Sequence, residues 1–142
     1  MGSFWMEVII GFAAAVISIL VARSVFPKKD HAFWRTGLVV AALVYVVFSF
    51  FGGSLQWVLI ELGGVLLYLS FAVLSKRYSL WYLALGWGLH VLWDLLLHGE
   101  DLDFVPSWYP AVCLGFDLAI AAYVIWLRRE RLALKEGKAV LA

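Results

Sequence analysis

The chain has 142 residues, of which 65% are hydrophobic and only 15% are charged, and its formal net charge is +1. Soluble domains are about half apolar and about a quarter charged, so this composition excludes an ordinary soluble domain and indicates a membrane protein. The small net charge gives no reason to expect nucleic acid as a partner. The single cysteine, Cys113, excludes an internal disulfide and a cysteine-based metal motif.

Five apolar stretches are long enough to cross a membrane as helices. A helix needs roughly 20 mostly apolar residues to span about 30 Å of hydrocarbon. In chain order, the predicted spans cover residues 4–26, 34–51, 54–75, 79–98 and 107–127. The first span lacks the basic flank and cleavage site of a signal peptide, so we expect it to be retained. The fold class is therefore predicted to be all-α and polytopic, with one transmembrane domain over residues 1–127 and a short basic tail over residues 128–142.

Basic residues predict the orientation of these spans. They fall only at the first connection, the third connection and the tail: Arg23, Lys28, Lys29, Arg35, Lys76, Arg77, Arg128, Arg129, Arg131, Lys135 and Lys138. The second connection carries no charge, and the fourth, residues 99–106, carries only Glu100, Asp101 and Asp103. The positive-inside rule then predicts that the amino terminus lies outside and the tail in the cytoplasm of a cell inner (plasma) membrane.

Away from the ends of the predicted spans, four ionisable side chains lie inside them: Glu61, His90, Asp94 and Asp117. Such groups cost a few kcal/mol or more in hydrocarbon, and they usually face a bundle interior and serve a function. At a rise of about 1.5 Å per residue, they lie about 6 to 15 Å below the outer ends of the third, fourth and fifth spans. We therefore predict one polar site in the outer half of the membrane.

Helical spacing predicts which residues share the site and which lie at its rim. His90, Asp94 and His98 recur every four residues, and so do Cys113 and Asp117, so each set shares one helix face. We expect His98, Cys113 and Glu7, which lies near the outer end of the first span, to be at the rim or in a secondary site.

Two further expectations concern packing. Beyond Arg35 and Thr36 at its cytoplasmic end, the second span has only Tyr45 and Ser49 as polar members, so it is predicted to be peripheral. Small residues, among them Gly11 on the first span and Gly115 on the fifth, predict that neighbouring helices approach closely.

Imidazole and carboxylate groups are ligands of zinc, iron and manganese. A single site would use His90, Asp94, Glu61 and Asp117, with a divalent metal as cofactor. His90 and His98 are about 12 Å apart along the helix axis, so they cannot both bind one ion, although Asp94 and His98 could form a second site at the rim. Haem fits less well, because the only histidine outside the fourth span, His31, lies in the first cytoplasmic connection.

Two readings without a metal remain open. The cluster could be a hydrogen-bonded lock between helices, with Glu61 and Asp117 protonated. It could instead line a pocket for a ligand held without any ion.

A longer pattern in the fourth and fifth spans resembles a known family. The segment GWGLHVLWD ends at Asp94 and is followed by His98, the loop Phe104-Val105-Pro106, Cys113 and Asp117. Over residues 84–126 this pattern resembles the bacterial family of small membrane proteins known as domain of unknown function 6010. Members of that family tend to have paired histidines where this chain has Leu97-His98, and a second cysteine near the positions of Gly115 and Phe116. The family has no established activity, and the resemblance implies only that His90, Asp94, His98, Cys113 and Asp117 form one site.

The sequence supports three hypotheses for function. The first is a metal-dependent enzyme that acts on a lipid or isoprenoid-like substrate from the outer leaflet, with Asp94 or Glu61 as general base. The second is a non-catalytic lipid- or pigment-binding protein or an accessory subunit of a membrane complex. The third is a small proton-coupled transporter, which the lack of ionisable groups toward the cytoplasm disfavours. The expected partners are the lipid bilayer, a lipid-like ligand, and either a second copy of the chain or a larger complex.

Overall fold

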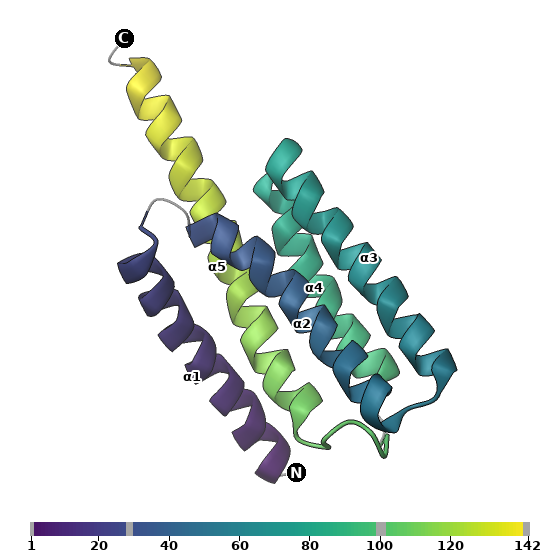
Figure 1. The fold of residues 1–142 in the computed structure, drawn as a ribbon. Coiled ribbons are helices and arrows are strands. Elements are labelled where there is room, and N and C mark those ends of the chain that lie inside the picture. The colour runs from purple at the N-terminus through teal and green to yellow at the C-terminus, as the bar shows by residue number, and fades with distance from the viewer. Residues whose placement is uncertain (1, 28–29, 99–101, 141–142) are drawn as a thin grey trace.

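The computed structural model describes residues 2–27, 30–98 and 102–140, and this part of the chain folds into five α-helices (Figure 1). They are α1 (Gly2–Val25), α2 (Asp30–Gly52), α3 (Leu55–Arg77), α4 (Leu80–Leu97) and α5 (Tyr109–Val140). All five are long and apolar enough to span a membrane, α5 over its Tyr109–Leu134 part. The prediction of an all-helical chain with five such helices is confirmed.

Helix ends follow local signals in the sequence. Ser54 and Ser79 precede α3 and α4 in extended backbone conformation, and their hydroxyl oxygens accept hydrogen bonds from the N–H groups of Trp57 and Trp81 at 3.4 and 3.3 Å. Serine is a preferred residue at this position because it satisfies a free N–H of the first turn. Pro110 lies in the first turn of α5, where no helical acceptor exists for its missing N–H. In four of the five helices, α1 to α4, both ends lie within about one helical turn of the ends of the predicted span.

Two boundaries differ from the prediction by more than a residue or two. α2 begins at Asp30, so His31, which the sequence assigned to a loop, lies in the first helical turn. α5 continues through the predicted tail to Val140 and projects beyond the other helices (Figure 1). The tail is rich in Arg, Leu, Ala, Glu and Lys, which are good helix formers, and it contains no proline.

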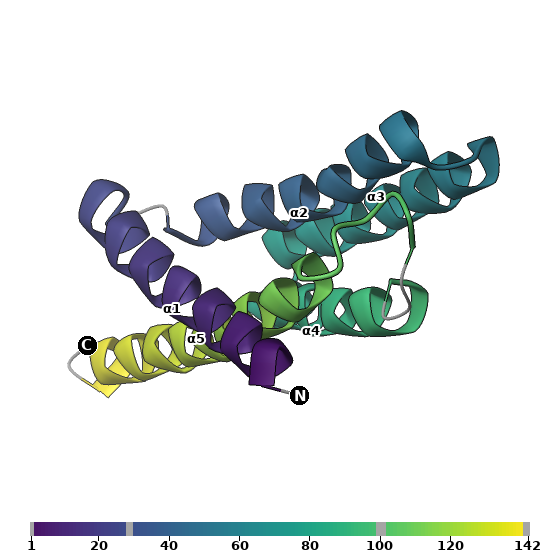
Figure 2. The same cartoon turned by 90° about the horizontal axis from the view of Figure 1, so that it is seen from below.

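The helices pack in an order that differs from their order in the chain. α1 packs on α5, α5 on α4, α4 on α3, and α3 on α2. α1 and α2 are consecutive but have few contacts, and Figure 2 shows them diverging from their connection.

Close packing of α1 on α5 depends on two glycines. A Cβ on Gly11 would lie 1.9 Å from the carbonyl oxygen of Val112, and a Cβ on Gly115 would lie 2.0 Å from that of Val8. Any side chain at either position would therefore clash with the backbone of the other helix. The prediction that small residues bring these helices together is confirmed.

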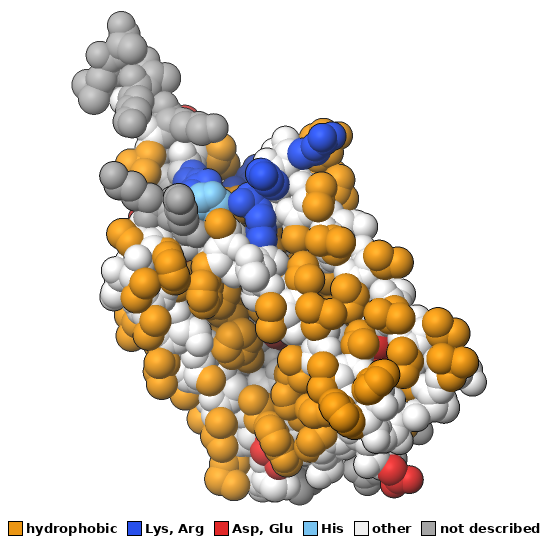
Figure 3. Space-filling view, viewed as in Figure 1, with side chains coloured by type: hydrophobic (Ala, Val, Ile, Leu, Met, Phe, Trp, Pro, Cys, Tyr) orange, Lys and Arg blue, Asp and Glu red, His pale blue; other side chains and the backbone are white. Residues whose placement is uncertain are grey.

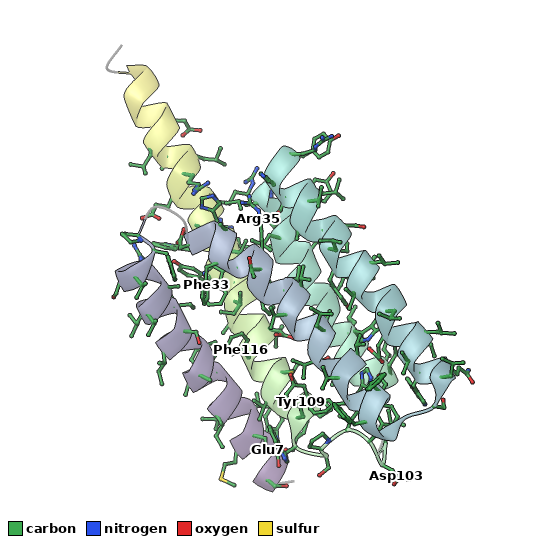
Figure 4. The ribbon with its side chains drawn as sticks, viewed as in Figure 1. Glu7, Phe33, Arg35, Asp103, Tyr109 and Phe116 are labelled. Atoms are coloured by element: carbon green, nitrogen blue, oxygen red, sulfur yellow. The ribbon has the colours of Figure 1, made fainter. Side chains whose placement is uncertain are left out.

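Charged and apolar side chains occupy different parts of the surface (Figure 3). Large apolar residues on the sides of the helices are widely exposed, for example Ile17 at 62% and Leu66 at 65%, as expected for a surface in contact with lipid. The described Lys and Arg side chains gather at one end of the bundle, called here the basic end. Glu7 and Asp103 lie at the opposite end, the acidic end (Figure 4). Lys28, Lys29, Glu100 and Asp101 lie outside the described residues.

Candidate functional site

A buried pair of ionisable residues joins α4 to α5. His90 of α4 and Asp117 of α5 are 0% and 1% exposed. The Nδ1 atom of His90 lies 2.8 Å from Oδ2 of Asp117, which is hydrogen-bond distance. Such a hydrogen bond in a dry interior holds both side chains in fixed positions.

Asp94 lies next to this pair, one turn along α4 from His90. Its Oδ2 atom is 3.5 Å from Nδ1 of His90, and the residue is 0% exposed. Within the described part of the chain, neither oxygen of Asp94 makes a hydrogen bond of good geometry, although the His90 ring and the Tyr45 hydroxyl lie beside it, and Nε2 of His90 has no partner. An unsatisfied buried polar group costs on the order of 1–3 kcal/mol, and more if it is charged, so Asp94 is costly as it stands.

His90, Asp94 and Asp117 together offer three ligand atoms within 4.8 Å of one another. Bonds of about 2.0–2.2 Å to a tetrahedral ion place neighbouring ligand atoms about 3.3–3.6 Å apart. The 3.5 Å separation between His90 and Asp94 already falls in this range, whereas the 2.8 Å bond between His90 and Asp117 would have to lengthen slightly. Two carboxylates with a neutral imidazole also match the charge of a divalent ion. Among the residues described, no other group of three such side chains meets this distance criterion.

Glu61 of α3 belongs to a second group. Its Oε1 atom lies 2.9 Å from Nε2 of His98, and its Oε2 atom accepts a hydrogen bond from the indole N–H of Trp93 at 3.1 Å. The sequence grouped Glu61 with His90 and placed His98 at the rim beside Asp94. The structure instead pairs Glu61 with His98, and both are buried.

Tyr45 of α2 lies between the two groups. Its ring stacks on the ring of His98 with centroids 3.9 Å apart, and it lies 6.1 Å from the ring of His90. Tyr45 is 0% exposed, and its hydroxyl has no partner among the described residues. The prediction that the second span is peripheral is therefore wrong, because α2 supplies one wall of the site.

Sequence reasoning also missed two aromatic residues of the site. Tyr68 of α3 lies over His90 with ring centroids 4.9 Å apart, and its hydroxyl donates to the carbonyl oxygen of Leu89. Trp93 holds Glu61, as described above. Tyr68 lies two helical turns from Glu61 on the same side of α3, and Trp93 precedes Asp94 in the chain, so this spacing is the sequence signal that could have placed both at the site.

An apolar crevice of about 340 Å³ reaches this site from the side of the bundle. It lies between α1, α2, α4 and α5, and Asp117 and Cys113 contribute to its lining along with Trp34, Trp87 and Phe116. Phe116 is labelled in Figure 4 on the part of α5 that faces this space. Cys113 is thus a lining residue of the crevice, one turn from Asp117. Glu7, near the start of α1, is half-buried at the acidic end and is not part of either polar group.

Comparison of the chain with family models, with curated proteins and with solved structures gives no match. The interpretation of the site therefore rests on the chemistry of its own residues.

Proposed function

We propose that the chain is a membrane protein in which His90, Asp94 and Asp117 bind one divalent metal ion, and that the bound ion acts on a lipid or isoprenoid-like substrate. The observation that carries this proposal is the grouping of three fully buried ligand residues, in which Asp94 lies 3.5 Å from His90 but forms no hydrogen bond of good geometry through either oxygen. A cation would satisfy these oxygens and offset the negative charge in the interior.

The ligand set favours zinc, iron or manganese, each of which accepts imidazole and carboxylate together. Three protein ligands leave a fourth position open for water or substrate, which is the arrangement of catalytic rather than structural zinc sites. An ion held there would polarise a substrate oxygen or activate a bound water. If Asp94 binds through one oxygen, its other oxygen is the nearest candidate for a general base.

The apolar crevice supports a lipid-like substrate. Its lining is mostly aliphatic and aromatic, it includes Asp117, and it lies between helices whose outer faces are apolar. A long hydrocarbon chain could enter it from the membrane without crossing water, and its polar end would then meet the ion. The volume of about 340 Å³ is at the lower end of the range for small-molecule sites.

We further propose that the acidic end faces the outside of a plasma membrane and the basic end the cytoplasm. The separation of charge between the two ends of the bundle supports this orientation through the positive-inside rule (Figure 3). His90 and Asp94 lie in the half of α4 that leads to the acidic end, so the site would serve the outer leaflet.

Metal analysis of the full-length protein tests the proposal. We expect about one zinc, iron or manganese ion per chain after reloading, and at least a roughly tenfold loss of affinity in His90→Gln and Asp94→Asn. Glu61→Gln is the matched control: it also changes a buried acid near the site, but it lies in the second group and should leave the metal content unchanged. Absence of a near-stoichiometric metal in the reloaded wild-type protein would contradict the proposal, as would equal metal content in all four proteins.

A non-catalytic role is the second candidate, favoured by the hydrogen bonds already present between His90 and Asp117 and between His98 and Glu61. On this view the cluster locks α3, α4 and α5 together, and the crevice holds a lipid or a segment of a partner in a larger complex. It predicts that His90→Ala unfolds the protein or prevents its assembly. A stable His90→Ala protein that has lost its metal would instead support the metal site.

A further inference from the structure

A second hollow lies at the basic end, remote from the polar site. It has a volume of about 970 Å³ and is bounded by α2, the connection between α3 and α4, and α5. Its cationic lining comes from Arg35, Lys76, Arg128 and Arg131, with His31 beside them. Figure 3 shows blue side chains and a pale blue histidine gathered near the point where α5 leaves the bundle, and Figure 4 labels Arg35 there. This hollow is called here the basic basin.

The arginines of the basic basin are held in place by the fold. The guanidinium of Arg35 donates from Nε to the hydroxyl of Ser75 at 2.8 Å and from Nη2 to the carbonyl oxygen of Ser75 at 3.0 Å. Arg131 donates from Nη2 to Nδ1 of His31 at 2.7 Å. Arg128 lies over the ring of Trp81, 5.2 Å from its centroid. Side chains ordered in this way lose little further entropy when they bind a ligand.

Within the described part of the chain, these positive charges have no acidic partner at ion-pair distance. Among the described side chains, no lysine or arginine lies within 4.0 Å of a carboxylate, since every ion pair found there involves a histidine. Asp30, an acid at this end, is buried and accepts hydrogen bonds from the hydroxyl of Tyr123 at 2.9 Å and from the backbone N–H of His31 at 2.7 Å. Its Oδ1 atom also lies 3.6 Å from Nδ1 of His31. The N-terminus of α4, capped by Ser79, adds a partial positive charge beside the basin.

We propose that the basic basin binds a phosphate group. Arginine presents several N–H donors in a planar fork that matches phosphate oxygens, and three arginines from two helices surround one hollow. Leu80, Leu132 and Leu134 give the basin an apolar wall where the helices leave the apolar part of the bundle. The phosphate can therefore belong to the headgroup of an anionic lipid or to a free phosphate compound. This site is independent of the metal proposal, because the two share no residue.

Binding measurements on the full-length protein in phosphatidylcholine nanodiscs test this proposal in two arms. In the first, phosphatidic acid is added in increasing proportion and its retention is measured by native mass spectrometry. In the second, inorganic phosphate is titrated calorimetrically without anionic lipid. We expect saturable binding in at least one arm, and the arm that responds identifies the source of the phosphate.

Variants distinguish a built site from general attraction to a basic surface. Arg35→Gln and Arg131→Gln should each weaken binding by about tenfold or more, because each removes charged hydrogen bonds to the ligand. Arg77→Gln makes the same change at the same end, but Arg77 is exposed and does not line the basin, so its effect should stay within about twofold. Arg131→Gln leaves the bonds between Arg35 and Ser75 intact. If Arg35→Gln fails to fold, the loss of phosphate binding in Arg131→Gln therefore still tests the site. Failure of both probes to saturate would overturn the proposal, as would equal losses in Arg77→Gln and Arg131→Gln.

Discussion

Asp94 is the residue whose environment is hardest to explain by stability alone. A fully enclosed carboxylate without a well-formed hydrogen bond weakens the fold. Asp94 lies 3.5 Å from Nδ1 of His90, whereas its neighbour Asp117 is held by the same atom at 2.8 Å. Residues that reduce stability in this way are expected at functional sites, where an ion or substrate supplies the missing contacts. The contrast between the two aspartates gives a direct test of which one stabilises the metal-free protein.

Replacing each aspartate by leucine in metal-free protein should have opposite effects. Asp94→Leu removes two unsatisfied oxygens and keeps an apolar side chain of similar size, so the free energy of unfolding should stay the same or rise. Asp117→Leu removes the 2.8 Å hydrogen bond to Nδ1 of His90 and leaves only the longer 3.5 Å contact with Asp94, so it should lower that free energy by about 1–3 kcal/mol. Thermal unfolding in detergent with a chelator measures both. A large loss of stability in Asp94→Leu would show that Asp94 is structural.

At the scale of the helix, apolar length in the sequence predicts the five spans well, because each must be about as long as the hydrocarbon is thick. The partners of each helix are less predictable. Counting polar residues suggested that the second span is peripheral, yet Tyr45 alone brings α2 into the site by stacking on His98. Helix rise gave the depth of Glu61 but not its direction around α3, and so it did not reveal that Glu61 faces His98 instead of His90. The direction in which a side chain points around its helix axis depends on how the helix packs against its neighbours. The sequence of one helix does not determine that packing.

The packing of α1 on α5 gives a prediction at this scale. Gly11→Ala places a Cβ against the carbonyl of Val112, so α1 must shift, and we expect a loss of about 1–3 kcal/mol in the free energy of unfolding. Gly63→Ala is the control, because a Cβ at Gly63 meets no atom within 4 Å and alanine favours the helix. Thermal unfolding compares the two. Equal stability of both variants would mean that the close contact of α1 with α5 contributes little.

The whole molecule combines a lipid-facing apolar side with two ends of opposite charge. The position of His90, Asp94 and Asp117 between these ends could be expected from the sequence, because ionisable residues stand out within apolar spans. The apolar crevice and the basic basin could not, because each is formed by residues of several helices whose relative placement depends on the order of packing. The separation of charge along the bundle also gives a prediction for its orientation.

Cysteine labelling tests the proposed orientation. In a Cys113→Ala background, a cysteine introduced by Ser3→Cys should react with a membrane-impermeant maleimide in intact cells. A cysteine introduced by Gly137→Cys near the end of α5 should react only after the membrane is permeabilised. The reverse pattern would place the metal site in the cytoplasmic half of the membrane.

The central claim is that one metal ion lies between His90, Asp94 and Asp117. Anomalous diffraction at the absorption edge of the reloaded metal tests it most directly, because it locates the ion without reference to activity. We expect a single peak about 2.0–2.2 Å from one atom of each of these three side chains. A peak beside Glu61 and His98 instead would contradict this position of the ion. The absence of any peak in crystals grown from the metal-reloaded protein would contradict it as well.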